Sequence, residues 1–122
     1  MTTEAQGNTR LLKLAGMLEK MDPTKYRGDV YNQDGKGNSI ALWAKANPKR
    51  WPSDPLVPGW PVLKGERVPL DSVQVEFCLS DEDLGAFWDF EDRSKSPAET
   101  AKWIRKFVEK RARKAARKAV KK

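Results

Sequence analysis

The sequence predicts a mainly helical protein: a compact single-domain bundle of four to five helices, continued by a long basic C-terminal helix. Apolar residues recur at helical spacing in several segments, capping residues precede these segments, and six of the eight prolines fall in one central stretch. The 122 residues can bury one modest core but exclude a separate cofactor-binding domain. We place the helical body at residues 1–108 and a basic extension at 109–122.

The first expected helix covers residues 9–21. Its apolar residues lie three or four positions apart, and Asn8 or Thr9 can cap its start. We expect it to end before Pro23, because the residue that precedes a proline is pushed out of the helical region. The apolar positions of this helix are Leu11, Leu14, Ala15, Leu18 and Met21.

A turn, a short helix and a proline-rich loop are expected next. Residues 34–38 contain two glycines between Asp and Asn, a composition typical of turns. Ser39 then opens a helix over residues 40–46. Residues 48–69 contain six prolines, which disfavour a helix there. We therefore expect an ordered loop that tryptophan side chains anchor to the body, and a small β-hairpin over 62–68.

Residues 70–79 fit two structures. Their apolar residues alternate as in a strand, whereas Leu70, Val73 and Phe77 also fit one face of a helix. The helix that follows is indicated more clearly, since Ser80 with an acid three residues later is a capping pattern.

The last helix has the clearest start signal. Ser96 is a favoured cap, Pro97 a favoured first residue, and Glu99 can reach back to the cap amide. Its inner face comprises Ala101, Ile104, Phe107 and Val108.

Several of these segments resemble a family of small uncharacterised bacteriophage and prophage proteins. Residues 10–19 (RLLKLAGMLE) are similar to the family's opening helix, residues 38–44 (NSIALWA) occupy the place of its small-residue helix, and residues 96–108 (SPAETAKWIRKFV) are similar to its last helix. The resemblance covers residues 9–108 and implies a compact helical fold with a helix at 70–78. It implies no activity, and the family's paired cysteines have no counterpart here.

The composition argues against an enzyme. The chain has no histidine, and no nucleophile and base can be paired, so we expect no catalytic residue, no metal site and no cofactor. The single cysteine, Cys78, is expected to be a small buried hydrophobe and fits a reducing cytoplasm, which the resemblance to phage proteins implies is that of a bacterial host cell. No segment has the roughly 18 apolar residues of a membrane span, and the N-terminus does not resemble a signal peptide.

The charge is distributed unevenly along the chain. The formal net charge is +7, but residues 102–122 hold eleven Lys or Arg and a single acid, while the rest of the chain holds 13 bases and 16 acids. Such asymmetry is typical of an arm that binds an acidic partner. Six acids and no base fall within residues 81–92, which we call the acidic cluster.

The basic segment is therefore the strongest functional candidate, with nucleic acid or a nucleoprotein as the favoured partner. Its cations can neutralise phosphates, but it lacks the Asn, Gln, Ser and Thr that discriminate bases. Two other interpretations stay open: a solvated tail, and a contact with the acidic cluster within one molecule or between copies of a homo-oligomer. The residues predicted to bind nucleic acid are Lys106, Lys110, Arg111, Arg113, Lys114, Arg117, Lys118 and Lys121.

Two other partner classes remain. The first is a protein complex of the host cell or of its defence system, which this protein would inhibit in the way that anti-CRISPR proteins inhibit their targets. The second is an anionic membrane surface, which is disfavoured because the tail has no bulky apolar face. The surface expected to contact a protein comprises Lys49, Arg50, Trp51 and Trp60.

The five tryptophans also suggest stacking on the bases of a single strand. Trp43 and Trp103 lie beside apolar residues on helix faces, where core packing is expected. Trp51 and Trp60 are the better surface candidates, although anchoring of the loop is the favoured role for both.

Overall fold

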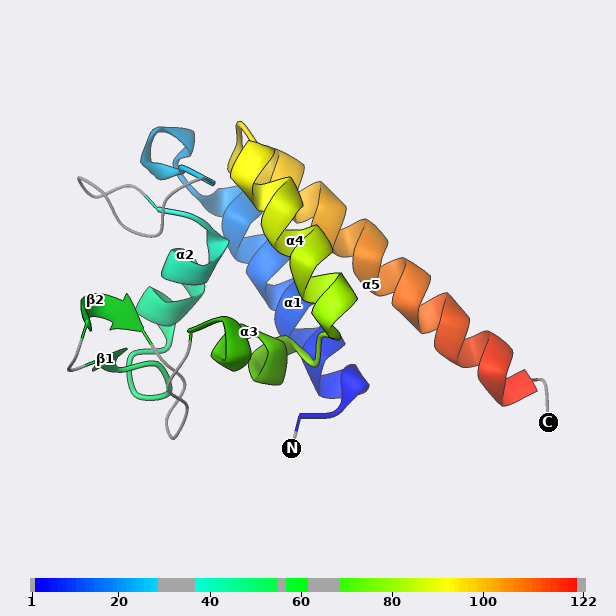
Figure 1. Cartoon of the computed structure of the whole chain (residues 1–122). Helices are drawn as coiled ribbons and strands as arrows, with labels where there is room; N and C mark the ends of the chain where they lie inside the picture. The colour runs from blue at the N-terminus through cyan, green and yellow to red at the C-terminus, as the bar shows by residue number, and fades with distance from the viewer. Residues whose placement is uncertain (1, 29–36, 55–56, 62–68, 121–122) are drawn as a thin grey trace.

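Five α-helices make up most of the structure, a computed structural model that describes residues 2–28, 37–54, 57–61 and 69–120 (Figure 1). They are α1 (Glu4–Lys20), α2 (Ser39–Ala46), α3 (Pro69–Phe77), α4 (Asp81–Arg93) and α5 (Pro97–Val120). A 3₁₀ turn, η1 (Pro23–Lys25), follows α1, and β1 (Ser53–Asp54) pairs with β2 (Val57–Pro61). The predicted mainly helical fold class is confirmed.

Helix α1 is the centre of the bundle. It packs against α5 along most of its length and also contacts α2 and α3. A turn over residues 94–96 joins α4 to α5, and the two helices touch through Phe87, Phe90 and Trp103. In Figure 1 the second half of α5 extends well beyond the other helices.

Helix α1 begins five residues earlier than the sequence indicated. Thr3 caps it: its hydroxyl accepts the N–H of Gln6 at 3.1 Å, and the Gln6 side chain accepts the N–H of Thr3 at 2.9 Å. The expected caps, Asn8 and Thr9, lie inside the helix, so that expectation was wrong. The expected stop is confirmed, because α1 ends at Lys20 and Pro23 opens the 3₁₀ turn.

Within the ambiguous stretch 70–79, residues 70–77 form a helix rather than a strand. Helix α3 ends at Phe77, and Cys78 takes a left-handed conformation with φ of 52°. Cys78 is partly exposed, so its expected burial was wrong. The physical reason is its position just after the last residue of α3, where its left-handed conformation ends the helix and takes Cys78 off the buried helix face.

The start signals of the last two helices are confirmed. The Ser80 hydroxyl accepts the N–H of Asp83 at 3.1 Å, and the Ser96 hydroxyl accepts the N–H of Glu99 at 3.2 Å. In α2 the cap is Asn38, whose side chain accepts the N–H of Ala41 at 3.1 Å.

The proline-rich segment contains a short antiparallel β-pair that the sequence did not indicate. Ser53 pairs with Pro61 and Asp54 with Val57, and the register shifts between the two pairs. The expected hairpin over 62–68 and most of the expected turn over 34–38 lie outside the described residues. Within the described residues, no helix is both long and apolar enough to cross a membrane.

The core lies where α1, α2, α3, α4 and α5 meet. The apolar positions expected in the first and last helices are buried, with Leu14, Leu18 and Ile104 fully inaccessible, except that Met21 and Phe107 are only partly buried. Trp43 is also buried, as expected. Gly7 allows α1 to approach the end of α3, because a β-carbon there would collide with the Phe77 carbonyl.

A buried carboxylate, that of Glu76 in α3, joins three parts of the chain. One of its oxygens accepts the indole N–H groups of Trp43 at 2.9 Å and Trp51 at 2.7 Å. The other oxygen pairs with Arg10 at 2.8 Å and Arg50 at 2.7 Å. The Glu76 side chain is fully inaccessible, so these four donors replace the water that it lost on folding.

A second buried carboxylate, that of Glu91 in α4, is held by hydroxyl and amide groups. It accepts the N–H of Ser39 at 2.9 Å, the Ser39 hydroxyl at 2.6 Å and the Tyr26 hydroxyl at 3.2 Å. Burial raises the pKa of Glu91 to about 7, although these hydrogen bonds act in the opposite direction. Burial beside Glu91 also raises the pKa of Tyr26.

We expect Glu76→Gln to destabilise the protein by about 3–5 kcal/mol, the usual cost of breaking a buried ion pair. An amide has one acceptor oxygen, so its NH₂ group must face either the two indoles or the two guanidinium groups. Urea unfolding followed by circular dichroism measures the loss. Glu82→Gln on the exposed side of α4 is the control and should change stability by about 0.5 kcal/mol or less. A similar small loss in both variants would contradict this role of Glu76.

We expect the free energy of unfolding to fall as the pH rises from 5.5 to 8. The folded state holds the Glu91 proton with a pKa of about 7, above the ordinary value of 4.5, so stability is lost as Glu91 ionises. The expected loss is about 2 kcal/mol. In Glu91→Gln the amide can accept from Ser39 N–H and donate to the Ser39 hydroxyl, and stability should vary far less over this range. Urea titrations at several pH values measure both profiles, and parallel profiles would contradict the prediction.

Candidate nucleic-acid interface

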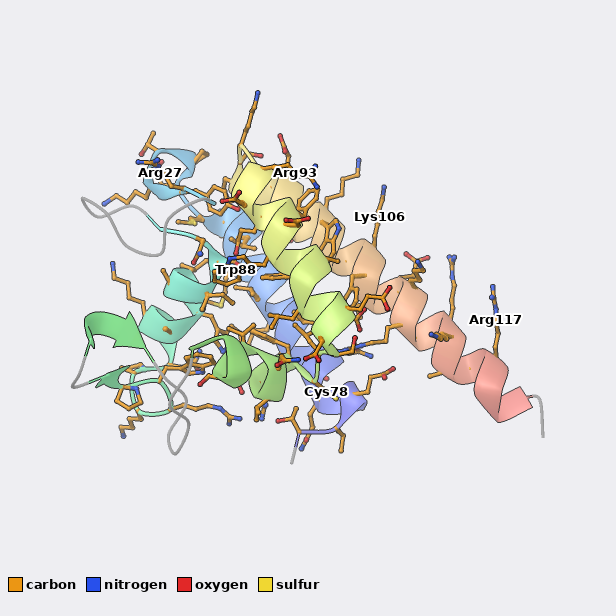
Figure 2. The ribbon with its side chains drawn as sticks, in the orientation of Figure 1. Arg27, Cys78, Trp88, Arg93, Lys106 and Arg117 are labelled. Atoms are coloured by element: carbon orange, nitrogen blue, oxygen red, sulfur yellow. The ribbon has the colours of Figure 1, made fainter. Side chains whose placement is uncertain are left out.

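The cations of α5 gather on the side opposite to its buried face. At about 100° per residue, Lys106, Lys110, Arg113, Lys114 and Arg117 fall within about 100° of one another around the helix axis. All five are exposed, and we call them the cationic stripe. Figure 2 shows Lys106 and Arg117 pointing to the same side of α5, away from the other helices.

Among the residues that the structure describes, no element is packed over the last part of α5. The helix continues to Val120, and every residue from Ala112 to Arg117 is exposed. We call residues 112–120 the free end. Of the predicted binding residues, Lys121 and the side chain of Lys118 lie outside the described part of the structure.

Arg111 does not belong to the interface, so its assignment is corrected. Its side chain is buried and donates to the Phe77 carbonyl at 3.1 Å, the Cys78 carbonyl at 2.6 Å and the Asn8 side chain at 2.8 Å. Its guanidinium also lies 5.0 Å from the centre of the Phe107 ring. These contacts satisfy the carbonyls at the end of α3, and they extend the body along α5 beyond the predicted boundary at residue 108.

Two cations of α5 are engaged in ion pairs on the surface. Arg105 pairs with Glu19 of α1 at 2.6 Å, and this hydrogen bond lowers the pKa of the Glu19 carboxyl. Arg113 pairs with Glu109 one turn earlier in α5. Both pairs are exposed, so they contribute little to stability and can exchange partners at low cost.

A groove of about 640 Å³ runs between α4 and α5. Lys106, Lys110 and Lys114 line one side of it, and Glu82 and Asp83 of the acidic cluster line the other. The cluster therefore faces one edge of the cationic stripe within the molecule. Glu91, another member of the cluster, is buried and is not part of this surface.

The aromatic rings beside the groove cover one another. Trp103 stacks on Phe107 with centroids 5.4 Å apart and on Phe90 with centroids 5.6 Å apart. Phe107 in turn lies between Trp103 and the Arg111 guanidinium. Both rings of α5 are therefore engaged with neighbouring side chains, and both are only partly exposed along the groove. Trp103 is half-buried, and it packs as expected against other aromatic residues of the body.

The surface expected to contact a protein is largely used by the fold. Trp51 is buried and bound to Glu76, so the idea that its ring is exposed was wrong; anchoring of its loop, the favoured role, is what it does. Arg50 forms an ion pair with the same carboxylate, although its side chain remains 44% exposed. Lys49 is exposed, and the side chain of Trp60 lies outside the described part of the structure.

No protein-family model matches the chain, and neither a curated protein nor a solved structure is significantly similar to it. The resemblance to small phage proteins therefore rests on the motifs quoted above.

We expect two truncations to separate the body from the free end. A protein ending at Lys110 loses the hydrogen bonds of Arg111 and should be destabilised by about 2 kcal/mol or more, because bonds from a charged donor are strong. A protein ending at Ala115 keeps Arg111 and should retain almost all its stability. Urea unfolding compares both with the full chain. Equal stability of the two truncated proteins would show that Arg111 does not anchor α5.

Proposed function

We propose that this is a small, non-enzymatic, phage-type protein that binds nucleic acid through the cationic stripe of α5, alone or within a nucleoprotein. The observation that carries the proposal is the free end of α5. A helix that leaves the body with every described side chain exposed is accessible from all sides. Its cations lie in a row on a rigid support, as contacts with a phosphate backbone require.

Electrostatics supports the same partner. Residues 1–101 hold 13 bases and 16 acids, so most of the positive field comes from α5. Four to six cations remain available for phosphates once Arg111 is assigned to the body and Arg105 to its pair with Glu19. Binding through these cations releases condensed counterions, which gives affinity without a need for shape matching.

The proposed binding is largely independent of base sequence. Residues 102–122 contain no Asn, Gln, Ser or Thr, the side chains that most often discriminate bases together with Arg. The exposed residues of the free end between the cations are alanines. Phosphate contacts fix position along nucleic acid but carry no sequence information.

The inhibitor of a protein complex is supported less well. Its expected contact surface contained Trp51 and Arg50, and both of these residues bind Glu76. An anionic membrane surface is supported least, because the free end has no bulky apolar side chain among its described residues.

A salt titration tests the proposal. With four to six phosphate contacts, log affinity for duplex DNA should fall against log salt with a slope of about −4 to −5. Affinity should then drop by about 10²- to 10³-fold between 50 and 200 mM salt. Fluorescence anisotropy with random duplexes of one length measures the slope, and different sequences should agree within a few-fold.

Two variants of equal net charge locate the interface. In the stripe variant Lys106, Lys110, Lys114 and Arg117 become Gln, which preserves helix propensity. In the control Lys13, Lys20, Lys25 and Lys45, all exposed on other elements, become Gln. The stripe variant should lose most of the binding at 100 mM salt and the control should keep it. Equal binding by both variants, or no binding by the unaltered protein at 50 mM salt, would contradict the proposal.

A further inference from the structure

We infer that the nucleic acid bound by α5 is duplex DNA, with the free end of the helix lying in the major groove. This inference rests on the proposed function and adds to it the class of nucleic acid and the groove. Three features of the structure favour it: the aromatic rings near the stripe are stacked on one another, the groove beside the stripe has acidic residues along one side, and the free end is slender.

A single strand would need aromatic faces, since proteins that bind single strands without sequence preference stack bases on open rings. The rings nearest to the stripe are poorly suited to this, because Trp103 stacks on Phe90 and Phe107, and Phe107 also contacts the Arg111 guanidinium. Trp43 and Trp51 are buried and their indole N–H groups bind Glu76. These tryptophans therefore offer no stacking platform.

The groove between α4 and α5 is also a poor path for a phosphate backbone. Its lysines face the carboxylates of Glu4, Glu82 and Asp83, which would repel phosphates laid along it. The groove lining ends at Ala115, whereas α5 continues to Val120. Phosphates therefore meet the least opposition at the part of the free end that follows Ala115, beyond these acids.

The free end has the dimensions of a groove-binding helix. An α-helix with its side chains is about 10–12 Å across, close to the width of about 12 Å of the major groove of B-form DNA. Ala112, Ala115 and Ala116 keep the free end narrow, while Arg113, Lys114 and Arg117 can reach the phosphates at the groove edges. The major groove of A-form RNA is too narrow for such a helix.

Fluorescence anisotropy at 100 mM salt with three probes of 20 base pairs or nucleotides tests the inference: a DNA duplex, an RNA duplex and a mixed-sequence single strand. The DNA duplex should bind about tenfold or more tightly than either other probe. The RNA duplex is the critical comparison, because its charge density is similar but its major groove is closed to a helix. Equal affinity for both duplexes, or tighter binding of the single strand, would overturn the inference and leave the proposed function standing. No binding to any probe at 50 mM salt would overturn both.

A matched pair of variants and a footprint locate the contact. Lys114→Gln with Arg117→Gln removes two charges at the free end, and Lys102→Gln with Lys106→Gln removes two beside the body. The first pair should weaken binding to the DNA duplex at least tenfold more than the second, since each phosphate contact contributes roughly tenfold at this salt. At saturation the protein should protect guanine N7, which lies in the major groove, from dimethyl sulfate more than adenine N3, which lies in the minor groove. Stronger protection of adenine N3, or equal losses in the two variants, would contradict the groove assignment.

Discussion

The hydrogen bonds and ion pairs of the buried Glu76 carboxylate are the interactions on which the rest of this fold depends. Each of its oxygens receives two donors, indoles on one side and guanidinium groups on the other. The donors come from α1, α2 and the segment after α2, so a single side chain of α3 fixes three separate parts of the chain. A buried charge is stable only when it is fully paired in this way, and for that reason the four partners behave as one unit.

The same short stretch of chain also sets the direction of α5. Glu76 is held by its side chain, and the next two residues, Phe77 and Cys78, are held through their carbonyls by Arg111. One end of α3 thus connects the polar centre of the body with the last anchored residue of α5. Because Arg111 also binds Asn8 of α1, the helix leaves the body at a defined angle, with the lysines of the stripe along one side of the groove and Glu82 and Asp83 along the other.

The sequence predicted those features that depend on local chemistry. The caps Ser80 and Ser96 and the buried faces of α1 and α5 follow from side-chain type and helical spacing. Residues 70–79 stayed ambiguous because a stretch of about nine residues fits both periods, and only its packing against α1 decides the outcome. Glu76, Glu91 and Arg111 were missed because a charged residue at a core position is ordinarily taken for a surface residue. For Arg111 a signal existed, since it continues the spacing of the buried residues Ala101, Ile104 and Val108. For the two glutamates, the hydrogen-bond partners lie 25 to 66 residues away in the sequence, and no local sequence pattern indicates them.

The packing of α1 against α5 has a consequence for the folding of the nascent chain on the ribosome. The apolar face of the first helix is covered largely by a helix that is synthesised about 80 residues later, and the bond from Arg111 to Asn8 spans 103 positions. At translation rates of about 5–20 residues per second, the apolar face of α1 stays uncovered for several seconds before α5 has been synthesised. The nascent chain must therefore be shielded or remain unfolded during this interval, and the body can close only after α5 has left the exit tunnel. The packing of α1 against α5 is therefore a late step that cannot take place while the segment between them is being synthesised.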